Sequence, residues 1–456
     1  MKVSVIGTGY VGLVSGVCLA EKGHQVVCVD IDPAKVDMIN AGEPPIFEAG
    51  LEELLKNNIG SRLSASTDLR TAVLESDISL IAVGTPFDGD KIDLQYIRDV
   101  SREIGEVLRD KTSFHAVIVK STVVPGTTDG VVAPILAEAS GGVPSVDFGV
   151  GMNPEFLKEG DAIVDFMNPD RIVLGGMDDQ TIDMLSELYS VFEGVDLVRC
   201  DTRTAEMIKY TANSLLATLI SFSNEIGNLC AEMGVDTLDA MNGMHLDKRF
   251  MPILADGTRV RPGMIGYLAS GCGFGGSCFP KDVKALIAHG ESVGNDMSLL
   301  RAVVGVNARQ PARMLELLSH HYPNLKGVDV TVLGVAFKPG TDDVRESPAL
   351  PIIADILRAG ANVTVYDPTA QHEAYEIFQD EVKYAETVGS AIRNAKAVLL
   401  VTHWPEFAKL PDLFAELEQP PVLIDGRRML PKDKFVRYEG IGLQTQKTTV
   451  SELLSD

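Results

Sequence analysis

Residues 275–282, Gly-Gly-Ser-Cys-Phe-Pro-Lys-Asp, combine residue types that suit a reactive thiol. The glycines leave the sulfur of Cys278 approachable, and we expect the Pro-Lys-Asp that follows to form a rigid turn ahead of a helix over Val283 to His289. A helix N-terminus and a neighbouring lysine both lower the pKa of a thiol. Cys278 is therefore a candidate nucleophile. A buried structural cysteine is the alternative, and Cys272 is a competing candidate.

A glycine pattern typical of dinucleotide binding opens the chain. Gly7, Gly9 and Gly12 follow an apolar run and lead into an expected helix, and Asp30 ends the next apolar run, eighteen residues after Gly12. Such glycines let a pyrophosphate approach the helix N-terminus, while the acidic residue accepts from a ribose hydroxyl. Because a carboxylate repels a 2′-phosphate, the pattern predicts NAD rather than NADP. Lys35 is close enough to contact this cofactor, with a solvated surface lysine as the alternative.

The thiol and the glycine pattern together predict an oxidation that continues beyond an aldehyde. A thiolate adds to an aldehyde to give a thiohemiacetal, and loss of a hydride from that adduct gives a thioester. Either feature alone would indicate far less. The eight histidines show neither HxxxH nor HExxH spacing, so no metal site is predicted.

The composition indicates a large globular protein of about two to four domains. The 456 residues are 45% hydrophobic and carry a formal net charge of −24, which disfavours nucleic acid as a partner. Local cations must then hold any phosphate-bearing ligand. Six cysteines without CxxC spacing, no secretion signal and no long apolar run predict a cytoplasmic protein with reduced thiols and no membrane partner.

The first part of the chain alternates between apolar runs and helical stretches. The runs at 3–6, 26–29, 78–83 and 116–119 end in glycine, aspartate, Gly-Thr-Pro or Ser-Thr turns. Parallel strands that end in loops at one edge of a sheet have this pattern. It predicts a doubly wound, Rossmann-like sheet over roughly the first 190 residues.

A long helix is expected over residues 204–233. This stretch contains no proline and only one glycine, Gly227. About 30 helical residues span ~45 Å, more than one small domain needs. The stretch is therefore a candidate connector and subunit interface, with two helices broken near Gly227 as the alternative.

The last part of the chain repeats the plan of the first. Gly334 and Asp367 stand where Gly7 and Asp30 stand, and Thr-His-Trp-Pro after Val401 matches the Gly-Thr-Pro of the first copy. The second copy lacks the glycine triad, so we expect it to bind a different nucleotide or only the nucleoside end of a substrate. The predicted fold is α/β, with two Rossmann-like doubly wound parallel-sheet domains joined by a helical domain. The predicted boundaries are 1–195 for the NAD-binding domain, 196–310 for the central helical domain with the thiol loop, and 311–456 for the second nucleotide-binding domain.

The order of the motifs resembles that of the UDP-glucose/GDP-mannose dehydrogenase family over essentially the whole chain. In that family the C6 alcohol of a nucleotide sugar is oxidised twice, two NAD molecules are reduced, and hydrolysis of a thioester releases the acid. The motifs that carry the resemblance are Gly7 to Gly12, Gly84-Thr85-Pro86, Lys120-Ser121-Thr122-Val123, Asn153 to Gly160, Ala205 to Tyr210 with Asn213, residues 275–282, and Phe337 to Thr341.

The resemblance implies catalytic roles for the matching residues. Cys278 is the nucleophile, and Lys209 stabilises the oxyanion-like intermediates. Lys209 and Asn213 are four residues apart and share one helix face, where an ammonium and an amide can meet one oxygen. The remaining implied catalytic residues are Glu155 as base or water activator, Glu159 as its assistant, and Thr122 and Asp282, which order the water and the thiol.

Contacts with both ligands are expected from the same motifs, with Lys281, Lys338 and Arg345 as the local cations. The residues predicted at NAD are Gly7, Gly9, Tyr10, Val11, Gly12, Asp30, Lys35, Gly84, Thr85, Thr122, Glu159, Lys281 and Arg345. The residues predicted at the nucleotide sugar are Glu155, Phe156, Leu157, Lys158, Lys209, Asn213, Arg249, Phe274, Gly275, Cys278, Phe337 and Lys338.

The chain departs from the family pattern at residues 251–263, where it carries a longer stretch than the usual short link. Arg249, Arg259 and Arg261 therefore compete for the role of the family arginine that grips the substrate. The Leu-Asp-x-Arg context favours Arg249.

The resemblance predicts UDP-glucose as the substrate and UDP-glucuronate as the product, with GDP-mannose as the alternative. Glu159-Gly160 and residues 404–407 resemble the UDP-glucose branch, residues 147–151 resemble the GDP-mannose branch, and Gly-Ser-Cys-Phe differs from the Gly-His-Cys-Ile of UDP-N-acetylhexosamine dehydrogenases. Two further hypotheses stay open: a two-electron dehydrogenase of the hydroxy-acid type, which would not need Cys278, and a non-catalytic nucleotide sensor. The resemblance also implies a homodimer.

Overall fold

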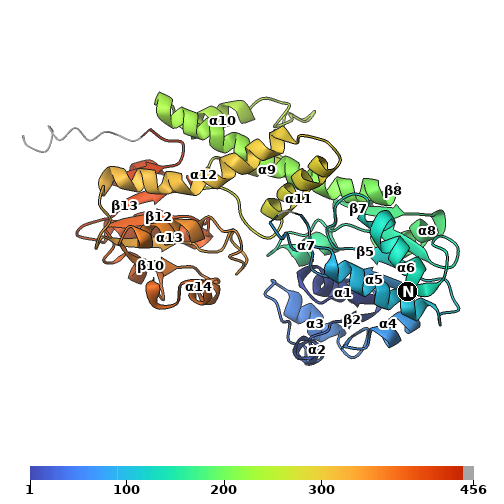
Figure 1. Cartoon of the computed structure of the whole chain (residues 1–456). Coiled ribbons are helices and arrows are strands. Elements are labelled where there is room, and N and C mark those ends of the chain that lie inside the picture. The colour runs from blue at the N-terminus through green and yellow to red at the C-terminus, as the bar shows by residue number, and fades with distance from the viewer. Residues whose placement is uncertain (90, 445–456) are drawn as a thin grey trace, which may run out of the picture. The chain divides into compact units, whose positions relative to one another are not determined.

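The computed structural model describes residues 1–89 and 91–444, and the chain divides into two compact units. The first comprises Met1–Ala212 with Lys284–Asn295, and the second comprises Asn213–Val283 with Asp296 onward. Each unit contains one sheet flanked by helices (Figure 1). The predicted α/β fold with two Rossmann-like sheets and a long helix is confirmed.

The sheet of the first unit has the strand order β3-β2-β1-β4-β5-β6-β7-β8. Every residue of β4, β5 and β6 is buried, as expected for strands with helices on both faces. β7 pairs with β6 in the antiparallel direction, which the prediction of a parallel sheet did not include. The strands are β1 (Lys2–Ile6), β2 (Gln25–Val29), β3 (Leu63–Ser66), β4 (Ile78–Ile81), β5 (Ala116–Val119), β6 (Gly149–Met152), β7 (Arg171–Gly176) and β8 (Asp196–Cys200).

The strand order of this sheet reverses between β1 and β4. Both strands are parallel to each other, so their carboxyl ends meet at one edge, where open α/β sheets bind their ligands. The helices of this unit are α1 (Tyr10–Glu21), α2 (Pro33–Asn40), α3 (Leu51–Asn58), α4 (Leu69–Glu75), α5 (Gln95–Leu108), the π-helical turn η1 (Thr128–Val132), α6 (Ala133–Ser140), α7 (Ala162–Met167) and α8 (Asp179–Leu188).

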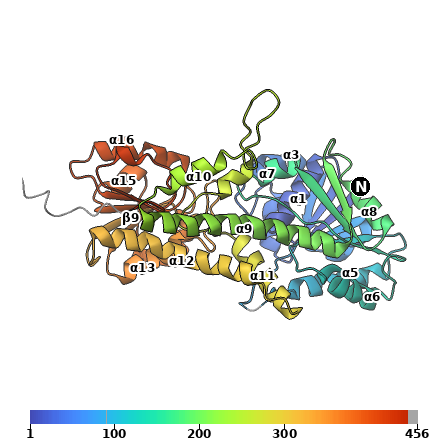
Figure 2. The same ribbon diagram turned by 90° about the horizontal axis from the view of Figure 1, so that it is seen from above.

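The predicted long helix is confirmed as α9 (Thr202–Met233), a single helix of 32 residues that Figure 2 shows along its length. The alternative of a break at Gly227 is wrong. A Cβ at this glycine would lie 2.4 Å from the Ser270 hydroxyl, so glycine is needed there for close packing rather than for a bend. The other helices that follow are α10 (Thr237–His245), η2 (Gly263–Tyr267), α11 (Phe279–Ser292) and α12 (Ser298–His321).

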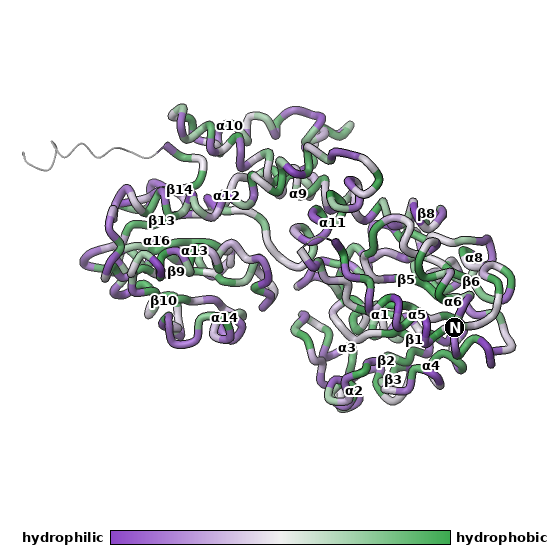
Figure 3. The backbone as a smooth tube through the Cα atoms, in the orientation of Figure 1, coloured by the Kyte–Doolittle hydropathy of each residue, from purple (hydrophilic) through white to green (hydrophobic). Residues whose placement is uncertain are grey.

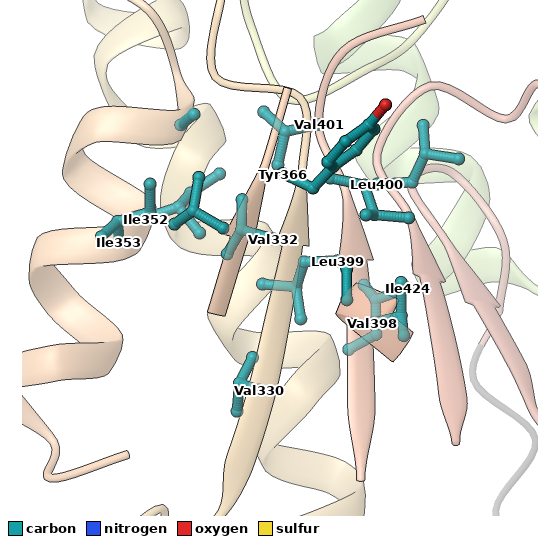
Figure 4. Packing of buried hydrophobic residues seen from close by; sticks show 14 of the residues in the cluster. Val330, Val332, Ile352, Ile353, Tyr366, Val398, Leu399, Leu400, Val401 and Ile424 are labelled. Atoms are coloured by element: carbon teal, nitrogen blue, oxygen red, sulfur yellow. The ribbon is translucent and has the colours of Figure 1, made fainter. Parts of the chain in front are cut away.

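The sheet of the second unit has the order β11-β10-β9-β12-β13-β14, so its six strands repeat the order β3-β2-β1-β4-β5-β6 of the first sheet. Its core is aliphatic, and Figure 4 shows Ile352 and Ile353 of α13 beside Val332 of β9. The elements are β9 (Asp329–Leu333), α13 (Ala349–Arg358), β10 (Asn362–Tyr366), α14 (Gln371–Phe378), η3 (Gln379–Glu381), β11 (Lys383–Tyr384), α15 (Val388–Ile392), β12 (Ala397–Leu400), η4 (Pro405–Lys409), α16 (Leu410–Ala415), β13 (Val422–Asp425), η5 (Lys432–Lys434) and β14 (Tyr438–Gly440).

One local expectation needs correction. The Pro-Lys-Asp after Cys278 is not a turn ahead of a helix, because α11 already begins at Phe279. Proline is tolerated in the first turn of a helix, where its missing N–H has no intrahelical partner. The helix α12 runs through the predicted domain boundary after residue 310, with Pro311 inside it. The domain boundaries stay a prediction.

The hydropathy of the chain follows this arrangement. Apolar stretches coincide with the strands and the inner helix faces, whereas polar stretches lie in connecting loops (Figure 3). In the part of the chain that the structure describes, none of the helices has the length and apolar character needed to cross a membrane.

Candidate active site

The glycine turn after β1 is shaped by its close contacts. Gly7 has a φ of +97°, and a Cβ there would lie 2.8 Å from the Ala82 carbonyl oxygen. A Cβ at Gly12 would lie 1.9 Å from the Gly7 carbonyl oxygen, so only glycine lets α1 start this close to the strand. Gly9, the N-cap of α1, has open space around it. The backbone N–H groups of this helix end are thus accessible to a pyrophosphate, as NAD binding requires.

Asp30 is fixed at the end of β2. One carboxylate oxygen accepts from the backbone N–H of Thr8 at 2.9 Å and from the Thr8 hydroxyl at 2.6 Å. Burial opposes ionisation, but these hydrogen bonds and the nearby Lys35 lower the pKa of Asp30 below its ordinary value. An ionised, oriented carboxylate at this edge suits a ribose hydroxyl. Ile31, which is 90% exposed, offers an apolar surface beside it.

Glu48 is a further candidate site residue, which the sequence did not single out. Its carboxylate accepts a hydrogen bond from the Tyr10 hydroxyl, from the Gly160 N–H at 2.6 Å and from the Ala162 N–H at 2.8 Å. It thereby joins the glycine turn to the loop that carries Glu159. No motif around Glu48 signals this role, because its three partners come from distant parts of the sequence.

Two predicted cofactor loops are joined at the carboxyl ends of β4 and β5. The Thr85 hydroxyl donates to the Thr122 carbonyl oxygen at 2.8 Å, and the Ser121 hydroxyl donates to the Val83 carbonyl oxygen at 2.6 Å. Thr85 is buried and its neighbour Gly84 is exposed. Thr122 therefore lies on the same edge of the sheet as the glycine turn.

Glu155 and Lys209 form a buried ion pair. Lys209 Nζ lies 2.8 Å from Glu155 Oε1, and the two side chains are 4% and 6% exposed. The second carboxylate oxygen accepts from the Leu157 N–H at 2.6 Å. Burial alone would raise the pKa of Glu155, but the charge and hydrogen bond of Lys209 lower it, so Glu155 is held as a carboxylate.

Phe156 lies beside this pair and is contacted by two cations. The Arg171 guanidinium lies 3.9 Å from the centre of the Phe156 ring, and Lys209 Nζ lies 5.5 Å from it. Cation–π contacts of this kind fix the orientation of a ring. Arg171 was not singled out from the sequence. Lys158, two residues after Phe156, pairs with Asp165.

Cys278 occupies the N-cap position of α11. Its carbonyl oxygen accepts the first helical hydrogen bond from the Asp282 N–H at 2.8 Å, and its side chain is half-buried. The Ser277 hydroxyl lies 3.6 Å from the Cys278 sulfur. The positive end of the helix dipole favours a thiolate at this position. The predicted placement of the thiol at a helix N-terminus is thus confirmed, one turn earlier than expected.

The loop before Cys278 is held against the loop that contains Phe337. The Gly276 N–H donates to the Arg345 carbonyl oxygen at 2.8 Å. A Cβ at Gly275 would lie 2.2 Å from the Glu346 carbonyl oxygen, and one at Gly276 would lie 2.7 Å from the Phe337 ring. The glycine pair is therefore required for packing, and it brings together two motifs that are about sixty residues apart in sequence.

Asp282 anchors the start of α11. It is 1% exposed and accepts from the Asn213 amide at 2.7 Å and from Lys281 Nζ at 2.6 Å. Asn213 belongs to α9, so this hydrogen bond ties the thiol helix to the long helix. The structure thus brings together Cys278, Asp282, Asn213 and Lys281.

Cys272 has a different environment from Cys278. It is completely buried, its thiol donates to the Val401 carbonyl oxygen at 3.5 Å, and burial raises its pKa. These features are typical of a structural cysteine. They favour Cys278 as the nucleophile.

Two of the three competing arginines, Arg259 and Arg261, lie in the stretch at 251–263, which forms a hairpin closed by a bridge between Ile253 and Arg259. Figure 2 shows this hairpin as the olive-green loop that projects beyond α10. Arg249 pairs with Asp247, and Arg259 donates to the carbonyl oxygens of Leu246 and Met251. Arg345 pairs with Asp343 in the same way. The roles predicted for Arg249 and Arg345 stay predictions.

The second copy of the nucleotide-binding plan uses its aspartate differently. Asp367 is fully buried and accepts from the backbone N–H groups of Val335 and Ala336 and from the indole of Trp404. The Asp367 carboxylate is therefore enclosed by hydrogen bonds within its own domain and is inaccessible to a ligand. Asp30, in contrast, is only partly buried. This difference supports the expectation that the two sheets hold different ligands.

The class of protein follows from three features: the glycine turn after β1, the strand order of the first sheet and the thiol at the N-cap of α11. Together they define a dinucleotide-dependent oxidoreductase. Three domain models of the UDP-glucose/GDP-mannose dehydrogenase family match this chain: the NAD binding domain at residues 1–193, the central domain at 203–309 and the UDP binding domain at 331–432. The chain belongs to this family. The predicted enzyme class, an NAD-dependent nucleotide-sugar dehydrogenase, and the predicted cofactor are thereby confirmed.

Individual relatives are similar over nearly their full length. The chain is 42% identical over 446 residues to the UDP-glucose 6-dehydrogenase AglM of Haloferax volcanii, covering 97% of this chain and 100% of the relative. It is also 42% identical over 454 residues to the GDP-mannose 6-dehydrogenase of Pseudomonas putida, with 97% and 100% coverage. The solved UDP-glucose dehydrogenase of Pyrobaculum islandicum has a TM-score of 0.88 and 40% identity, with 97% of each chain covered.

Proposed function

We propose that this protein oxidises the C6 hydroxyl of UDP-glucose to a carboxylate through a thioester on Cys278. The observation that carries this proposal is the placement of Cys278 at the N-cap of α11, on a glycine loop packed against the Phe337 loop. A two-electron alcohol dehydrogenase has no use for such a thiol. NAD, when bound, accepts the two hydrides.

The proposed reaction has three stages. The alcohol loses a hydride and a proton and becomes an aldehyde. The Cys278 thiolate then adds to the aldehyde carbon, and the adduct loses a second hydride to become a thioester. Water attacks the thioester, the carbon–sulfur bond breaks, and the carboxylate and the thiol are released. One sugar, two NAD and one water thus give one carboxylate, two NADH and three protons.

The two buried residues of the ion pair serve different stages of this reaction. Lys209 donates to the oxyanion that forms on the C6 oxygen in the thiohemiacetal and during hydrolysis. Glu155 takes a proton from the attacking water, with Glu159 and Thr122 as supporting groups. Asp282 and Asn213 hold the α11 terminus at which the thiolate is stabilised.

The preference for UDP-glucose rests on the motifs at 159–160 and 404–407 and on several UDP-glucose 6-dehydrogenases at about 40% identity. GDP-mannose is the second candidate because a GDP-mannose 6-dehydrogenase is equally similar. NADH formation should be followed with both donors at equal concentrations. We expect a kcat/KM for UDP-glucose at least about 100-fold above that for GDP-mannose, since a nucleobase pocket leaves polar groups unpaired with the wrong base. The reverse ratio would assign the protein to GDP-mannose.

We further propose that the protein is a homodimer formed through α9. Leu215, Phe222 and Leu229 repeat every seven residues, so they share one helix face, and they are 54%, 46% and 51% exposed. A row of exposed apolar side chains on one helix marks an interaction surface. The cytoplasmic location stays a prediction from the sequence.

A charge placed in this row should separate the subunits. We expect Phe222→Glu to change the mass measured by light scattering from dimer to monomer, because a buried unpaired carboxylate is costly at an interface. The control is Val436→Glu, which changes an isolated apolar residue that is 88% exposed and should leave the dimer intact. A Phe222→Glu protein that is still dimeric would place the interface elsewhere.

A further inference from the structure

Lys120 is a buried lysine that the proposed reaction does not use. It follows β5 directly, and Asn153 follows the neighbouring strand β6, whose residues pair in register with β5 up to Val119 and Met152. The carboxyl ends of the two strands therefore place Lys120 and Asn153 side by side. Lys120 is only 3% exposed.

The Lys120 ammonium is held by neutral groups. Its Nζ donates to Asn153 Oδ1 at 2.9 Å and lies 3.5 Å from the Tyr189 hydroxyl oxygen, while the Asn153 amide donates to the Val173 carbonyl oxygen at 2.9 Å. The Tyr189 hydroxyl also donates to Asn153 Oδ1. Across residues 1–89 and 91–444, no carboxylate forms a hydrogen bond or ion pair with Lys120. A buried ammonium without such a partner gives up its proton more easily than a paired one.

The charges around Lys120 come from several elements. Burial lowers the pKa of Lys120 to about 8, with Lys209 acting in the same direction and Glu155 acting against it. Glu155 in turn feels the charge of Lys120. Burial raises the pKa of Tyr189, so this residue stays a neutral phenol. The other charged residues that line the adjoining cavity are Lys158, Asp165, Asp170 and Arg171.

A cavity joins these groups. Its volume is about 80 Å³, and its lining includes Lys120, Asn153, Glu155 and Tyr189, together with Asp165 and Asp170. One water molecule needs roughly 10 to 15 Å³ of such space and two to four polar partners. The cavity therefore has room and partners for several water molecules between Glu155 and Lys120.

We propose that Lys120 is a proton-relay residue behind Glu155. The inference rests on the proposed function, in which Glu155 receives a proton from the hydrolytic water. As the O–H bond on Glu155 breaks, an N–H bond forms on the neutral amine of Lys120 through cavity water. The resulting ammonium then loses a proton to water on the side of Asp165 and Asp170, which restores both groups for the next turnover.

The kinetic test compares Lys120→Met and Lys120→Arg with the natural protein between pH 6 and 10. We expect kcat of the natural protein to rise with an apparent pKa near 8. Lys120→Met should lower kcat by about 10- to 100-fold and abolish that pKa, while each KM changes less than about threefold. Lys120→Arg should behave like the methionine variant, because a guanidinium keeps the charge but cannot accept a proton. Recovery of kcat and of the pH profile in Lys120→Arg would overturn the relay.

A milder variant and a surface control separate a relay from a structural role. Tyr189→Phe removes one acceptor of the ammonium, so it should fold normally and shift the apparent pKa downward by up to about one unit. An unshifted profile in Tyr189→Phe would count against the relay. Lys56→Met makes the same chemical change as Lys120→Met on an exposed residue and should leave the profile unchanged.

A stability measurement tests the lowered pKa of Lys120, which the relay requires, even if the natural protein proves inactive. The Lys120 pKa is about 8 in the folded protein against 10.5 for an ordinary lysine. Between these values the unfolded chain binds more protons, so the stability of the natural protein rises with pH relative to Lys120→Met. We expect the ratio of the two unfolding constants to change by about 100-fold between pH 8 and 10.5. A constant ratio would show that the pKa of Lys120 is not lowered in the folded protein, and this result would overturn the relay. Inactivity of the natural protein with all nucleotide sugars would refute only the proposed function.

Discussion

Replacing Cys278 with alanine is expected to lower the steady-state rate of NADH formation by at least about 1,000-fold, because without the nucleophile the reaction halts after the first hydride transfer. The substitution leaves the N-cap carbonyl of α11 in place, so the helix should still form. The aldehyde, lacking a sulfur to bind, cannot be carried to the thioester. Steady-state rates with saturating NAD and UDP-glucose, recorded after the first turnover, measure the effect.

Cys272→Ala provides the matched control for this experiment. Both variants lose one sulfur from the same loop region, but Cys272 is fully buried and its thiol donates a hydrogen bond to the Val401 carbonyl oxygen. We expect this control to keep its turnover and to lose some stability, since a small cavity forms in the core. If Cys278→Ala kept full turnover, the enzyme would be a two-electron dehydrogenase. If instead Cys272→Ala were the inactive variant, the nucleophile would have to be reassigned.

Replacing Lys209 with methionine is expected to lower kcat by about 100- to 1,000-fold, the usual effect of losing one oxyanion donor. The same change leaves Glu155 buried without its partner. Removal of one member of a buried ion pair costs about 3 to 5 kcal/mol of stability. Lower activity could then reflect unfolding, so the folded fraction must be measured by thermal denaturation.

The double variant Lys209→Met with Glu155→Gln separates catalysis from stability. Neutralising both partners removes the uncompensated charge, so most of the lost stability should return. Activity should not return, because both the oxyanion donor and the base are absent. A double variant that recovered both stability and activity would show that the ion pair only holds the fold.

The parts of this site that sequence could predict are those that local chemistry fixes. Gly12 is required by its contact with Gly7 in the same turn, and Cys278 sits beside residues that start a helix. The long helix could be predicted because its sequence contains no proline and a single glycine. A second Rossmann-like sheet could be predicted because Gly334 and Asp367 repeat the positions of Gly7 and Asp30.

The parts that sequence could not predict depend on residues that meet only in the fold. Glu48 reaches three groups that are far away in sequence, and Arg171 stacks on Phe156 from a different strand. Lys120 belongs to a motif that the sequence shows, but its burial and its neutral partners Asn153 and Tyr189 are set by the fold. The helix α11 begins before the predicted turn because Pro280 lies in its first turn, where a proline does not break a helix.

The central claim is a four-electron oxidation, and its most direct test is the amount of NADH formed per nucleotide sugar consumed. UDP-glucose should be the limiting reagent, with NAD in excess and the residual sugar measured by chromatography. The account predicts two NADH for each UDP-glucose and a carboxylate product. One NADH for each sugar, with an aldehyde or ketone as the product, would contradict the thioester route.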